Sequence, residues 1–139
     1  MAKGKDFKKP YPKSSQHFQV TGIPSNIDYD LQPPVFSLKH MQYQRDYCIS
    51  QCDEETKSAI LEKLLKISQL TWRKIRSEPK DGLGCEQIPQ HRFIASFPST
   101  ITPEVTILVF RYSKAGRIAG YREKDMYHVL LVGPDLYKH

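Results

Sequence analysis

Residues 105–132 read Val-Thr-Ile-Leu-Val-Phe-Arg-Tyr, Ser-Lys-Ala-Gly, Arg-Ile-Ala-Gly-Tyr-Arg, Glu-Lys-Asp, Met-Tyr-His-Val-Leu-Leu-Val. The first run is β-branched and aromatic and is apolar at both alternating sets of positions, which is typical of a strand buried on both faces. The connections at 113–116 and 123–125 are short, and such connections join antiparallel neighbours. We therefore predict an antiparallel meander with strands at 105–112, 117–121 and 126–132.

An amphipathic helix is predicted upstream of this meander. Asp53-Glu54-Glu55 offers an N-cap followed by acids, which favour the positive end of the helix dipole. The helix is expected to end at Ser77-Glu78-Pro79, because a residue before proline avoids helical conformations. Between these ends, one stripe recurs at three- and four-residue spacings: Ile60, Leu61, Leu64, Leu65, Ser68, Trp72 and Ile75.

Together these elements predict an α+β fold, in which a helical layer packs on one face of a small antiparallel β-sheet. Residues 35–40 alternate in polarity and indicate a further short strand. Residues 1–34 hold five of the ten prolines and show no sustained periodicity. We therefore expect a basic extended or disordered arm at 1–34 and a single α+β domain at 35–139.

The excess positive charge of the protein lies at the two ends of the chain. The 139 residues carry a formal net charge of +6, and residues 1–13 alone contain five lysines and one aspartate. Such a balance makes polyanions plausible partners, and the lysines of the arm would add salt-dependent affinity for RNA. Flexible basic termini are also common without any specific role, so the function of the arm stays open.

Nothing in the sequence suggests a membrane segment or a cofactor. The longest purely apolar run has four residues, whereas a membrane-spanning helix needs about 20. The basic N-terminus leads into no apolar stretch, so we expect no secretory signal and a cytoplasmic protein. Cys48, Cys52 and Cys85 are interpreted as reduced thiols. No metal is predicted, because the Cys48–Cys52 spacing lacks a second pair of ligands.

Cations, phenols and imidazoles are concentrated in the last thirty residues. These residue types suit metal-free cleavage of an RNA phosphodiester, in which a base takes the 2′-hydroxyl proton, cations hold the pentacovalent phosphate and an acid protonates the leaving 5′ oxygen. They are also ordinary residues of a half-exposed sheet, and composition alone favours that interpretation. The set is Arg111, Tyr112, Lys114, Arg117, Tyr121, Arg122, Lys124, Tyr127, His128, Tyr137, Lys138 and His139.

The alternation of the last strand sorts its residues by face. His128 is expected to share a face with Met126 and Leu130. Tyr127 is expected to point to the other side, together with residues 129 and 131. His128 is therefore equally well interpreted as a half-buried, hydrogen-bonded imidazole or as a catalytic base.

The C-terminal third, with its basic strand, its return strand and its short last strand, resembles the closing meander of the RelE/HigB/ParE superfamily of bacterial toxins. The helical segment Ile67-Ser-Gln-Leu-Thr-Trp72 and the following Gly82-Leu-Gly-Cys-Glu86 are similar to small RelE-like proteins. The resemblance covers roughly residues 35–139. It implies a metal-independent, ribosome-dependent mRNA endonuclease that inhibits translation and is neutralised by a small antitoxin protein.

The resemblance also implies roles for individual residues. The catalytic candidates comprise two cations for the scissile phosphate and two acid-base groups: Arg111, Arg117, His128 and Tyr137. The candidates for contacts with mRNA or ribosomal RNA are basic residues near the last turn and in the tail: Arg122, Lys124 and Lys138.

Two further interpretations stay open. A non-catalytic module would use the same sheet to bind RNA or a protein partner by charge and aromatic packing. The ParE branch of the superfamily acts on DNA gyrase without cutting RNA. The chain also departs from such toxins by its length and by the basic arm at 1–34, so the roles carried over from the family are expectations.

Overall fold

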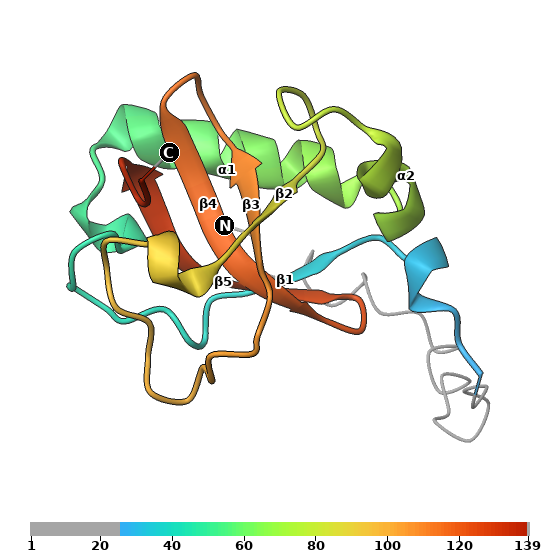
Figure 1. Cartoon of the computed structure of the whole chain (residues 1–139). Helices are drawn as coiled ribbons and strands as arrows, with labels where there is room; N and C mark the ends of the chain where they lie inside the picture. The colour runs from blue at the N-terminus through green and yellow to red at the C-terminus, as the bar shows by residue number, and fades with distance from the viewer. Residues whose placement is uncertain (1–25, 139) are drawn as a thin grey trace, which may run out of the picture.

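The structure is a computed structural model that describes residues 26–138. These residues form two α-helices, five β-strands and three short 3-10 helices. The α-helices are α1 (Glu54–Ser68) and α2 (Trp72–Ser77). The strands are β1 (Val35–Ser37), β2 (Glu86–Ile88), β3 (Ile107–Arg111), β4 (Gly116–Glu123) and β5 (Met126–Pro134), and the 3-10 helices are Tyr29–Leu31, Ile49–Gln51 and Gln90–Arg92. Figure 1 shows both α-helices beside the sheet. The α+β class is therefore confirmed.

The strands form one sheet in the order β1-β5-β4-β3-β2. The predicted meander of β3, β4 and β5 is confirmed, since both of its pairings are antiparallel. The prediction of a wholly antiparallel sheet is wrong, because β1 pairs with β5 in parallel. Both helices and three further strands lie between β1 and β5 in the sequence. Parallel pairing of two strands requires a long connection of this kind. β2, at the opposite edge, was not predicted.

A register shift changes the faces of β5. Ala119 pairs with Leu131, whereas the next residue, Gly120, pairs with Val129. Leu130 is therefore an extra residue on β5, as in a β-bulge. As a result Leu131 lies in the core on the side away from the helices, while Tyr127 and Val129 pack toward the helices. The expectation that Leu131 shares the face of Tyr127 is wrong for this reason.

The predicted start of the long helix is confirmed, but the helix is interrupted. The side chain of Asp53 accepts a hydrogen bond from the backbone N–H of Thr56 at 2.8 Å, which caps α1. α1 ends at Ser68, and Thr71 begins α2 by accepting a hydrogen bond from the backbone N–H of Lys74 at 3.1 Å. The prediction of one continuous helix is therefore wrong, whereas its predicted end at Ser77 is confirmed by the end of α2.

The sheet has a buried core on each face. The core on the helix side contains Trp72, Phe110 and Tyr127. The other face is covered by the segment between β2 and β3 and by the C-terminal tail, which contribute Phe93 and Tyr137. This tail is fixed by backbone hydrogen bonds to residues 92–94. The C-terminal tail therefore folds over the sheet.

Residues 26–34 belong to the arm that we expected at 1–34, and residues 1–25 of that arm lie outside the described residues. Asp30 attaches this segment to the body of the domain. Its carboxylate forms ion pairs with Arg76 at 2.5 Å and with Arg122 at 3.0 Å. The hydrogen bond from Arg76 is the main cause that lowers the pKa of Asp30 from 3.8 to about 2.

This lowered pKa predicts a stability difference that depends on pH. Because the pKa of Asp30 is lower in the folded state, its contribution is complete above the unfolded value near 3.8 and is lost as the pH falls toward 2. We expect Asp30→Asn to be less stable than the wild type at pH 6, and the difference to shrink between pH 4 and pH 2. Urea unfolding of both proteins at several pH values measures this. A difference that stays constant down to pH 2 would contradict it.

Candidate functional site

Arg111 at the end of β3 and Arg117 near the start of β4 lie opposite each other in the sheet. The four residues between the two strands, 112–115, form the β3–β4 turn, and the strand register pairs the two arginines directly. Like charges in this position repel each other unless other groups compensate them. Arg111 is compensated by Asp81, 2.7 Å from its Nη1, and by Glu86, 3.5 Å from its Nη2. Its Nε is buried and has no hydrogen-bond partner among the described residues.

Arg117 is held by a phenol and by the turn instead of by a carboxylate. Its Nε donates to the hydroxyl of Tyr137 at 3.3 Å. Its Nη1 donates to the backbone carbonyls of Lys114 and Gly116, each at 3.1 Å. Among residues 26–138 no carboxylate forms an ion pair with Arg117, although only 8% of the residue is exposed. The positive charge of Arg117 is therefore not compensated by any carboxylate of the described residues.

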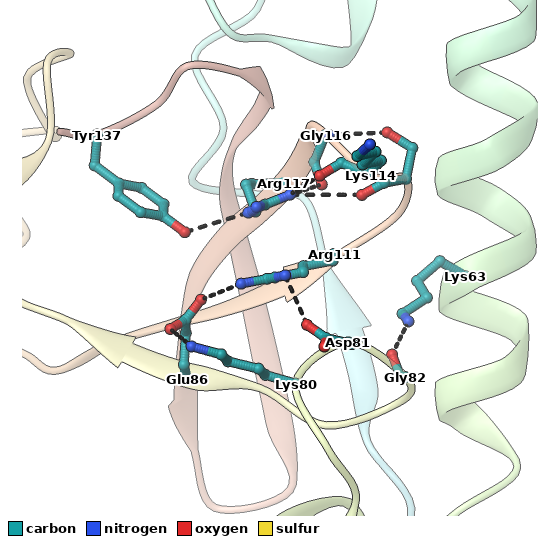
Figure 2. A network of polar contacts seen from close by, with 11 residues as sticks. Lys63, Lys80, Asp81, Gly82, Glu86, Arg111, Lys114, Gly116, Arg117 and Tyr137 are labelled. Atoms are coloured by element: carbon teal, nitrogen blue, oxygen red, sulfur yellow. Dashed lines mark hydrogen bonds and ion pairs between the residues drawn. The ribbon is translucent and has the colours of Figure 1, made fainter. Parts of the chain in front are cut away.

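Figure 2 shows these residues together, and we call them the arginine cluster: Asp81, Glu86, Arg111, Arg117 and Tyr137. Three of the four predicted catalytic residues thus meet at one place. Arg111 and Arg117 come from the predicted hairpin, and the fold of the tail brings in Tyr137. Neither Asp81 nor Glu86 was among the candidate residues predicted from the sequence. Asp81 lies in the loop after α2, and Glu86 lies on the strand that was not predicted.

His128, the fourth catalytic candidate, lies elsewhere. It pairs with Tyr121, four residues beyond Arg117 on β4, which places it about 13 Å further along the sheet. The imidazole is buried and stacks on the ring of Tyr121 at 4.6 Å, with His40 at 5.0 Å. Its Nε2 lies 3.1 Å from a carboxylate oxygen of Glu123. His128 is therefore not placed to act on a group bound at the arginine cluster.

The predicted RNA-binding residues are also separate from the arginine cluster. Arg122 points to the helix side of the sheet, where its guanidinium lies 4.5 Å from the centre of the Trp72 ring and pairs with Asp30. Lys124 lies in the β4–β5 turn with a positive φ of 60°. Lys138 is exposed next to Tyr137, and its carbonyl oxygen accepts two hydrogen bonds from Arg92.

A cleft of about 730 Å³ adjoins the arginine cluster between α1, the loop after α2 and the β3–β4 turn. We call it the α1 cleft. The charged residues that line it are Glu62, Lys63, Lys66, Asp81, Arg111 and Lys114. The Nζ of Lys63 donates a hydrogen bond to the carbonyl oxygen of Gly82. Burial lowers the pKa of Lys63, and the charge of Lys66 adds to this effect.

Neither Lys63 nor Lys66 was among the candidate residues predicted from the sequence. Their three-residue spacing places them on one helical face, so this spacing was the signal available. The spacing does not reveal which elements face the two lysines, because those contacts depend on the tertiary fold.

No metal-binding group emerges from the described residues. Within residues 26–138, no cluster of three or more His, Cys, Asp or Glu side chains is arranged to hold a metal ion. Cys48, Cys52 and Cys85 are free thiols. None of the helices in the described part of the chain has the length and apolar character required to cross a membrane.

Comparison of the chain with protein-family models, curated proteins and solved structures finds no match. The functional assignment therefore depends on the geometry of the arginine cluster and on the resemblance noted in the sequence.

Proposed function

We propose that the protein is a metal-independent endoribonuclease of the toxin type, which cleaves mRNA and thereby inhibits translation. The observation that carries the proposal is the arginine cluster, in which Arg117 contacts the hydroxyl of Tyr137 and pairs in the strand register with Arg111. Cations and a phenol in one place are what phosphodiester cleavage without a metal requires. The α1 cleft next to the cluster adds further positive charge for a polyanionic substrate.

The proposed reaction is attack of the RNA 2′ oxygen on the adjacent phosphorus, with loss of the 5′ oxygen of the next nucleotide. The products are a 2′,3′-cyclic phosphate and a 5′-hydroxyl. Arg111 and Arg117 stabilise the charge that develops on the phosphate oxygens. Tyr137 donates a proton to the leaving 5′ oxygen. Glu86, whose carboxylate contacts Arg111 at 3.5 Å, is the group of the cluster proposed to take the 2′ proton.

The wider context of the reaction is proposed from the sequence resemblance. The resemblance to RelE-like toxins implies that a ribosome presents the mRNA to the enzyme and that a small antitoxin neutralises it. Arg122, Lys124 and Lys138 lie outside the arginine cluster, so in this proposal they contact more distant RNA. His128 has no catalytic role in this proposal, because it lies beside Tyr121 and away from the arginine cluster.

A second candidate function is binding of RNA without cleavage. It is favoured by the burial of Arg117 and by its hydrogen bonds to turn carbonyls, since these give the side chain a structural role. In this case the cluster and the α1 cleft would hold phosphates and no bond would break. Turnover distinguishes the two functions.

To test the proposal, the purified protein is added to a bacterial cell-free translation reaction, and mRNA 5′ ends are mapped with and without ribosomes. We expect new ends that require ribosomes. Arg111→Ala should reduce their rate of appearance about tenfold to a hundredfold, because it removes one of the two guanidinium groups at the phosphate. Intact mRNA together with normal protein synthesis would contradict the proposal. Binding without new ends would favour the second candidate.

A further inference from the structure

The α1 cleft contains more positive charge than its own residues neutralise. Four cations and two carboxylates line it, and Asp81 is already paired with Arg111 at 2.7 Å. Within residues 26–138, neither Lys63, Lys66 nor Lys114 forms an ion pair. Three lysines therefore face one cleft without a carboxylate partner of their own.

Lys63 is the most constrained of these lysines. Its ammonium group is partly buried and is fixed by the hydrogen bond to the Gly82 carbonyl. A cation removed from water without a counter-charge is unfavourable, and the nearby charge of Lys66 adds to this cost. An anion bound in the cleft would relieve both effects. The fixed ammonium also means that a ligand would meet a preorganised donor.

The cleft and the arginine cluster share two residues, since Arg111 and Asp81 belong to both. Figure 2 shows Lys63 of α1 and Arg111 of β3 on the two sides of the loop that carries Asp81 and Gly82. A substrate phosphate held at the cluster therefore has neighbouring phosphates that can enter the cleft. A free small anion would occupy only part of the surface formed by the arginine cluster and the α1 cleft together.

We propose that the α1 cleft binds the phosphate backbone of single-stranded RNA directly beside the cleavage point. The inference rests on the proposed function, because it takes the arginine cluster as the place of the scissile phosphate. A volume of about 730 Å³ lies in the range of pockets that hold nucleotide-sized ligands, about 300–1,000 Å³. The cleft is therefore large enough for a short stretch of one strand.

The test measures binding of an oligoribonucleotide with 2′-O-methyl groups, which lacks the attacking 2′-hydroxyl and so is not cleaved. The variant is Lys66→Glu/Lys114→Glu, because both side chains are exposed in the cleft rim and their exchange leaves the core unchanged. The matched control is Lys57→Glu, an exposed lysine of α1 outside the cleft.

We expect the double variant to bind at least tenfold more weakly in about 0.1 M salt. The slope of log affinity against log salt should also become shallower by roughly 1 to 1.5, which corresponds to two lost phosphate contacts on a single strand. The Lys57→Glu control should stay within about threefold of the wild type and keep its slope. Fluorescence anisotropy across a salt series gives both quantities.

Three results would overturn the inference. They are an unchanged affinity and slope in the double variant, displacement of the oligonucleotide by equimolar inorganic phosphate, and equally tight binding of an RNA duplex. Failure of the proposed function looks different. In that case all-ribose mRNA stays intact, while the methylated oligonucleotide still binds and still depends on Lys66 and Lys114.

Discussion

Replacing Arg117 by Gln is expected to slow mRNA cleavage by about 100- to 1,000-fold. Arg117 is the guanidinium of the arginine cluster without a carboxylate partner among the described residues, and it contacts the hydroxyl of Tyr137. The variant thus removes a preorganised charge from the phosphate and a neighbour that positions the proton donor, and loss of one such donor costs this much in other enzymes. The measurement is the single-turnover rate of cleavage on ribosomes.

Three controls accompany this variant, because Arg117 also has a structural role. Its Nη1 supports the β3–β4 turn through the carbonyls of residues 114 and 116, so unfolding of each variant is measured alongside the rate. Arg73→Gln removes an exposed arginine of α2, outside the arginine cluster, and should cleave like the wild type. Arg117→Lys keeps the charge and should recover part of the rate. If the Arg117→Gln variant is folded and cleaves mRNA at the wild-type rate, the proposed role of Arg117 in the reaction is contradicted.

The parts of the fold that the sequence predicted correctly are local. Strands joined by three or four residues have little choice but to pair as neighbours, and the cap at Asp53 depends only on the residues that follow it. The same short turn brings the ends of β3 and β4 together, although the direct pairing of Arg111 with Arg117 was not predicted. The hairpin that carries Arg111 and Arg117, two of the five residues of the arginine cluster, was therefore accessible from the sequence.

The parts that were missed depend on distant contacts. β1 finds its parallel partner through Val35 opposite Met126, about ninety residues later in the chain. The pairing of Phe93 with Tyr137 joins two segments that have no strand pattern of their own. The bulge at Leu130 alters alternation without any glycine or proline in β5 at that point. Since no local pattern encodes these contacts, the position of the tail over the sheet was not predictable. The separation of His128 from the arginine cluster, by contrast, follows from the local β4–β5 hairpin, in which His128 pairs with Tyr121.

Trp72→Ala is expected to produce the largest loss of stability, about 3–5 kcal/mol. Trp72 is 1% exposed and begins α2 just after the helix break. Its indole N–H donates to the carbonyl of Asp125 at 3.0 Å, which attaches the β4–β5 turn to the helices. The ring also carries the guanidinium of Arg122 on its face. Urea unfolding of the wild type and the variant measures the difference.

Trp72→Phe separates packing from hydrogen bonding at the same position. It keeps an aromatic ring beside Arg122 but removes the donor to Asp125. We therefore expect a smaller loss of about 1–3 kcal/mol, since the carbonyl loses its partner and the core loses little volume. Leu61→Ala, at an exposed position of α1, should change stability by less than about 1 kcal/mol. If Trp72→Ala were no more damaging than Leu61→Ala, the packing of α2 against the sheet would be wrong.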